Sequence, residues 1–170
     1  MYPNREVFEY GYDILNSEKY QELDNYMQHG TLTVKDHSIN VANKCIEYVN
    51  KHNIECDKKS LVVGALLHDF FLYDWHIKGN RLNKMHAFTH PAIALKNAEQ
   101  YYELNKIEKD MIKKHMWPTT IVLPKEKETW IIVLIDKICA FQETLKIFDK
   151  FSVKWWTTPT YEVEVGASDP

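Results

Sequence analysis

The segment Trp130–Phe141, WIIVLIDKICAF, is apolar on nearly every side of a helix and yet has an aspartate, Asp136, near its centre. A helix that is hydrophobic all round is buried inside its fold, so this segment predicts the central helix of a helical bundle. An unpaired carboxylate is very unfavourable in such surroundings. The sequence must therefore supply Asp136 with a partner inside the bundle.

Most of the remaining chain also has the apolar spacing and the capping residues of helices. Thr33 and Asp57 are suited to cap two of these helices. Pro91 suits the first turn of another, and Asn105 with Glu108 matches a capping box. Ser17 can cap a second helix within the first stretch. The expected helices cover residues 5–28, 33–52, 57–71, 91–102, 105–117 and 125–146, with a turn at His29-Gly30, a loop over 73–88 and a short strand in the YEVEV of the tail. The predicted class is all-α.

The chain has 170 residues, which suits one domain, and its net charge of -3 argues against a nucleic-acid binder. We expect a helical extension over residues 1–32, a core over 33–146 and a tail over 147–170. No apolar run approaches the ~18 residues of a membrane span, and the N-terminus lacks a secretory pattern. The three cysteines show no CxxC pairing, which indicates reduced thiols in a cytoplasmic protein.

Six ionisable residues fall on the core-facing sides of five predicted helices: His37, His68, Asp69, His90, His115 and Asp136. A single inward histidine is most often a core residue with a local hydrogen bond. Six such groups buried independently would each need a separate partner. A divalent metal satisfies all of them together, because imidazole nitrogen and carboxylate oxygen are its ordinary ligands. The pattern therefore predicts a metal centre within the bundle.

The order His37, His68-Asp69, Asp136 resembles the HD-domain superfamily of metal-dependent phosphohydrolases. LLHDF at the end of an apolar helix and IDK within the last buried helix carry the resemblance, which extends from about Asp36 to Ala140. His90 in HPAIA and His115 in IKKHMWP are similar to the additional ligands of the dinuclear branch. That branch includes bacterial proteins that hydrolyse diadenosine tetraphosphate. The resemblance implies an HD-type bundle with two divalent metal ions. Histidine-rich ligands with carboxylates suit Fe, Mn, Co, Ni or Zn better than Ca.

Carried over residue by residue, the resemblance implies that His37, His68, Asp69 and Asp136 surround one ion. Asp69, His90 and His115 would hold the second ion, with Asp69 bridging the two. His86 lies four residues before His90 and is either a further ligand or a residue that touches substrate. Where many catalytic relatives have HDIGK, this chain has HDFFLYD, without the Lys or Glu that follows the aspartate.

Two divalent ions and two aspartates leave two positive charges, which favour an anionic substrate. We therefore expect hydrolysis of a phosphate ester or anhydride in a small metabolite such as a nucleotide, by water that the ions activate. Asp69, His86 and Lys137 are the catalytic candidates. Lys78, Arg81 and Lys114 are candidate phosphate contacts and Trp117 a candidate base contact, against the simpler alternatives of a solvated basic loop and ordinary packing. Two other functions stay open: a di-iron oxygenase, and a metal-stabilised nucleotide-binding or regulatory module without turnover.

Overall fold

The structure is a computed structural model that describes residues 1–29, 32–73 and 86–148. It is built almost entirely of helices, which confirms the predicted all-α class. A two-stranded antiparallel hairpin is the one sheet among the described residues. The elements are α1 Arg5–Tyr10, α2 Tyr12–Leu15, α3 Glu18–Gln21, the 3-10 helix η1 Glu22–Asn25, β1 Met27–His29, β2 Leu32–Thr33, α4 Val34–Lys51, α5 Lys58–Leu67, α7 His86–Tyr101, α8 Lys106–Lys114 and α9 Lys127–Phe148.

The predicted caps begin the three helices on which they were expected. The side chain of Thr33 accepts a hydrogen bond from the backbone N–H of Asp36, and that of Asp57 accepts one from Ser60. Asn105 and Glu108 form the reciprocal capping box at the start of α8. Each cap satisfies a backbone donor that the first helical turn would otherwise leave unpaired.

Several expected boundaries are wrong. Residues 5–28 form four short helical segments and a strand, because glycine at position 11 and the cap at Ser17 interrupt the helix. Helix α7 begins at His86, so Pro91 lies within it and residues 86–88, which were expected in a loop, are helical. Proline removes one backbone donor, and the helix continues past that single lost bond. Helix α8 ends at Lys114 rather than Trp117, and α9 covers Lys127–Phe148 rather than 125–146. The expected YEVEV strand lies outside the described residues.

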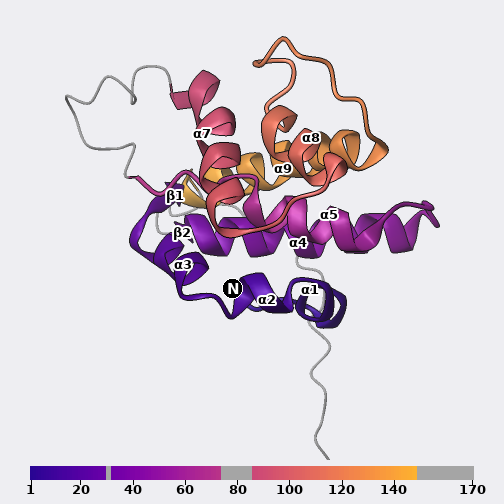
Figure 1. The fold of residues 1–170 in the computed structure, drawn as a ribbon, viewed down its shortest axis with the longest axis horizontal. Helices are drawn as coiled ribbons and strands as arrows, with labels where there is room; N and C mark the ends of the chain where they lie inside the picture. Colours follow the sequence, from indigo (N-terminus) through magenta and orange to yellow (C-terminus); the bar gives the residue numbers. More distant parts are fainter. Residues whose placement is uncertain (30–31, 74–85, 149–170) are drawn as a thin grey trace, which may run out of the picture.

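Helix α5 is the centre of the bundle. Every residue from Ser60 to Leu67 is buried, and α5 packs against α4, α8, α9 and α1. In Figure 1, α4 and α5 form a middle layer between the short N-terminal helices and the group formed by α7, α8 and α9. Because the chain turns immediately after α5, the residues that follow Leu67 emerge inside the bundle rather than at its surface.

The described helices include none that is long and apolar enough to cross a membrane. The three cysteines, Cys45, Cys56 and Cys139, are free thiols, as expected from their odd number and spacing.

Candidate metal centre

The six predicted ligands come from five helices and meet in the middle of the bundle. His37 lies one turn into α4, and His90 lies near the start of α7. His68 and His115 are the C-terminal caps of α5 and α8, and Asp69 follows His68 directly. Asp136 lies near the middle of α9. All six residues are buried, with at most 7% of their surface exposed.

The four histidine rings have the same orientation relative to the centre. Nδ1 of His68 donates to the carbonyl of Ala65 at 2.7 Å, and Nδ1 of His115 donates to Ile112 at 2.9 Å. Nδ1 of His90 likewise donates to the carbonyl of His86 at 2.8 Å. Because these acceptors require the proton on Nδ1, Nε2 is left as the metal-binding nitrogen of each ring.

His37 has the same arrangement, with a carboxylate in place of the carbonyl. Its Nδ1 lies 2.8 Å from Oε2 of Glu143. Glu143 is buried and also accepts a hydrogen bond from Asn40 at 2.8 Å. A carboxylate that holds the outer nitrogen of a ligating histidine fixes the ring and makes its inner nitrogen a better ligand.

In one half of the centre, two histidines lie around Oδ2 of Asp69 and Oδ1 of Asp136. Nε2 of His37 lies 3.1 Å from Oδ1 of Asp136 and 3.9 Å from Oδ2 of Asp69. Nε2 of His68 lies 3.6 Å and 3.4 Å from the same two oxygens. These four side chains are the set predicted for the first ion.

In the other half, two further histidines lie around Oδ1 of Asp69. Oδ1 of Asp69 lies 3.2 Å from Nε2 of His90 and 3.5 Å from Nε2 of His115. The two histidine nitrogens are themselves 2.9 Å apart. The oxygens of one carboxylate therefore face two different pairs of histidines.

These distances fit bound cations. Two ligand atoms at about 2.0–2.2 Å from one ion, separated by 90–109° at the metal, lie roughly 2.8–3.6 Å from each other. Most of the donor distances above fall in or close to that range. Three triads have donor atoms close enough to hold an ion: Asp69, His90 and His115; His37, His68 and Asp69; and His68, His115 and Asp136, which joins the two halves. Two of the atoms that face the centre, Nε2 of His68 and Oδ1 of Asp69, are buried without a hydrogen-bond partner.

The charges of the cluster also suit a bound cation. Burial opposes the charged form of His37, but hydrogen bonds to Asp136 and Glu143 raise its pKa to about 10. Burial would raise the pKa of Asp69, yet the neighbouring histidines hold it well below its ordinary value, and the pKa of Asp136 is lowered for the same reason. Both aspartates are therefore anions that need positive charge beside them. Protons on histidine provide it in the metal-free protein, and a divalent cation can replace them.

Two supporting residues were not predicted from the sequence. Glu143 holds His37, and Nε2 of Gln28 donates to Oδ2 of Asp69 at 2.7 Å. Glu143 lies seven residues after Asp136 and thus on the same face of α9, a spacing that could have indicated it. No local pattern singles out Gln28, because it reaches the centre from the hairpin strand β1.

His86 and Lys137 lie next to the centre. The His86 ring stacks on His90 with 4.6 Å between ring centroids, and its Nδ1 is 2.8 Å from the hydroxyl of Tyr73. Nζ of Lys137 lies 3.4 Å from the carbonyl of His115 and 3.3 Å from that of Val133. Partial burial lowers the pKa of Lys137.

The structure places the remaining candidates elsewhere. The ammonium of Lys114 is buried in an ion pair with Asp110, and Trp117 packs edge-on against Trp130 with 5.0 Å between centroids. Within the described part of the chain, neither side chain forms a hydrogen bond, ion pair or ring contact with the six ligands. Lys78 and Arg81 lie outside the described residues.

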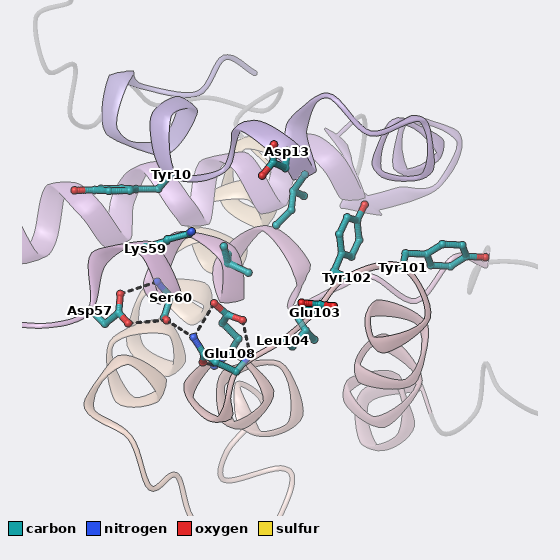
Figure 2. Close-up of a pocket in the computed structure, with 13 residues that line it drawn as sticks. Tyr10, Asp13, Asp57, Lys59, Ser60, Tyr101, Tyr102, Glu103, Leu104 and Glu108 are labelled. Atoms are coloured by element: carbon teal, nitrogen blue, oxygen red, sulfur yellow. Dashed lines mark hydrogen bonds between the residues drawn. The ribbon is translucent and has the colours of Figure 1, made fainter.

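A surface cavity of about 490 Å³ lies at the opposite ends of α5, α7 and α8 from the metal cluster. Figure 2 shows its polar lining, where Asp57 and Glu108 are joined through Ser60 and Asn105. These side chains are the caps of α5 and α8 described above. Asp57, Asn105 and Glu108 thus already have a structural role at the ends of these two helices.

Comparison with protein-family models, with curated proteins and with solved structures finds no match for this chain. The case for a function therefore depends on the geometry of the centre and on the chemistry of its donor atoms.

Proposed function

We propose that this protein is a metal-dependent phosphohydrolase with a dinuclear centre, similar to the HD-domain superfamily. The observation that carries the proposal is the position of Asp69, whose two oxygens face His37 and His68 on one side and His90 and His115 on the other. A structural role for a buried aspartate needs one cationic partner. A carboxylate between two pairs of histidine Nε2 atoms suits two cations.

We assign the ligands to the two ions by their distances to the Asp69 oxygens. His37, His68, Asp69 and Asp136 would hold one ion, and Asp69, His90 and His115 the other. Nitrogen-rich ligand sets favour Fe, Mn, Co, Ni or Zn over Ca. When bound, such a pair of ions supplies an activated water at neutral pH and stabilises the charge that develops on a phosphoryl group.

The protein would contribute orientation, proton positions and a favourable field for an anion. Glu143 and Gln28 fix His37 and Asp69 through the hydrogen bonds described above. Burial raises the pKa of Tyr73 to about 12, so its hydroxyl stays protonated and can donate to Nδ1 of His86. When Tyr73 is the donor, the proton of neutral His86 is on Nε2, which suits a residue that gives a proton to a leaving oxygen.

The substrate follows from charge. Two divalent ions among two ligating aspartates leave a net positive centre, which favours a phosphate ester or anhydride, and we propose a small phosphorylated metabolite such as a nucleotide. Lys78 and Arg81 stay predicted phosphate contacts. The cytoplasmic location expected from the cysteines stays a prediction as well.

The test starts with protein purified without chelator, whose metal content is measured by elemental analysis. Metal-free protein is then reloaded with each candidate ion and assayed for phosphate release from nucleotides, dinucleotides and phosphodiesters. We expect activity only with two ions per chain, and its loss in His115→Ala. His52→Ala is the matched control, because His52 is an exposed histidine at the end of α4.

Two outcomes would replace the proposal with a rival. Oxygen consumption without phosphate release by the metal-loaded protein would indicate the oxygenase. Nucleotide binding without turnover, in protein that holds both ions, would indicate the binding module.

A further inference from the structure

Helix α9 exposes a row of large apolar side chains on the face opposite the metal centre. The row, called here the α9 seam, has exposed fractions of 39–65% and consists of Trp130, Leu134, Ile138, Phe141 and Leu145. Ile132, Cys139 and the ligand Asp136 occupy the buried side of the same helix. Single exposed apolar residues are common, but a continuous row of five along one helix indicates a surface that another element covers.

The spacing within the seam suits a helix as the partner. Leu134, Ile138, Phe141 and Leu145 are separated by four, three and four residues. That is the repeat of the a and d positions through which two helices pack side chains into each other's gaps. An extended chain has a repeat of two and would not match these intervals.

We propose that the partner is a second copy of this chain, and that α9 packs antiparallel against α9 of the other copy about a two-fold axis. An axis between positions 137 and 138 places Trp130 of one copy opposite Leu145 of the other. The same axis places Leu134 opposite Phe141, since both pairs of residue numbers have the same midpoint. Ile138 meets its counterpart beside the axis. In the two outer pairs an aromatic residue faces a leucine, so the row is complementary to its own copy, as a two-fold interface requires.

Charge permits this arrangement. Lys137 is the ionisable residue closest to the axis, and two such ammonium groups would repel each other. Each one, however, lies near backbone carbonyls of its own chain, those of His115 and Val133. Antiparallel helices also bring opposite ends of their dipoles together.

The area is sufficient for a weak but specific dimer. A large apolar residue has on the order of 200 Å² of surface, so the seam exposes roughly 500 Å² in each copy. Two copies would bury about 1,000 Å² of apolar surface, and the flanking polar residues raise the total toward the ~1,200 Å² at the lower end of specific interfaces. Interfaces of about 1,600 Å² begin at micromolar dissociation constants, so we expect this smaller interface to dissociate in the micromolar range or above.

The first test is sedimentation equilibrium of the full-length protein from 1 to 200 µM. We expect a monomer–dimer equilibrium, and we expect Phe141→Glu to weaken it at least about 100-fold, as removal of a central interface residue does. Phe8→Glu is the matched control, because Phe8 is an apolar residue of α1 with 45% exposure, the same as Leu134. Association by the Phe141→Glu protein at wild-type strength would overturn the proposal.

A full-length protein that is monomeric throughout would also overturn it. If Phe141→Glu then lowers the thermal stability of that monomer, the seam is covered from within the chain, and residues 149–170, which follow α9 directly, become its occupant.

The second test fixes the direction of the helices. In a Cys56→Ser background, which removes the partly exposed native thiol, Trp130→Cys protein is mixed with Leu145→Cys protein and treated with a short bifunctional maleimide. We expect cross-linking between the two variants and little within either one. Efficient cross-linking of Leu145→Cys with itself would show parallel helices and overturn the antiparallel arrangement.

Discussion

Replacing Asp69 by asparagine should weaken both metal sites, whereas the same change at Asp136 should weaken one. The carboxylate of Asp69 has one oxygen near each pair of histidines. The Asp136 oxygen faces His37 and His68. Asparagine has the shape of aspartate but lacks its charge and has only one ligating oxygen. The variant should therefore keep the fold while its metal content falls.

The size of the effect follows from linkage. Loss of a residue that merely orients a ligand weakens metal binding about 10–100-fold, so we take about 100-fold for loss of a charged ligand itself. At a fixed metal concentration well above the dissociation constant, each affected site then loses about 2.7 kcal/mol of stabilisation. Asp69→Asn should lose about twice that amount. For a chain of this length the corresponding decrease in melting temperature is roughly 10–20 °C for Asp69→Asn and 5–10 °C for Asp136→Asn.

The assay compares melting temperatures with saturating metal and with chelator, so that the effect of each change on the metal-free fold is subtracted. Elemental analysis gives the stoichiometry of the same samples. Asp13→Asn, an exposed carboxylate outside the centre, serves as the control. Equal losses in the Asp69 and Asp136 variants, or an unchanged two-ion content in Asp69→Asn, would refute the bridging role.

Three further predictions concern the surroundings of the centre. Because the pKa of His37 is raised from 6.5 to about 10, its charged form stabilises the metal-free protein fully below about pH 6.5. That stability should decline as pH rises toward 10, while metal affinity increases. Denaturant titrations and metal titrations from pH 6.5 to 9 can measure the two effects. Glu143→Gln should lower metal affinity about 10–100-fold, as calorimetry would show, while the Glu103→Gln control, on an exposed side chain, should not. Gly64→Ala should destabilise the protein by about 1–3 kcal/mol in urea, because a Cβ there would lie 2.6 Å from the Sδ of Met111; unchanged stability would show that Met111 moves aside freely.

Local chemistry accounts for the parts of the fold that were predicted correctly. Thr33, Asp57 and Asn105 begin their helices because each satisfies backbone donors within three residues, an interaction that needs no tertiary contact. Helix α8 ends at Lys114, before the expected Trp117, and α7 begins at His86, before the expected Pro91. In both places a preference of one residue was weaker than the packing of the neighbouring helices, which the sequence does not display.

The sequence by itself determined which side chains would be buried together. A histidine or aspartate on the apolar face of a helix has to enter the core, and helical periodicity alone identifies that face. Only the tertiary structure decided how those side chains meet. The division of the Asp69 oxygens between two pairs of histidines, the support that Glu143 gives to His37, and the approach of Gln28 from β1 all depend on where five helices and a hairpin pack. Such contacts join residues up to 106 positions apart, and their geometry is set by packing rather than by any local pattern.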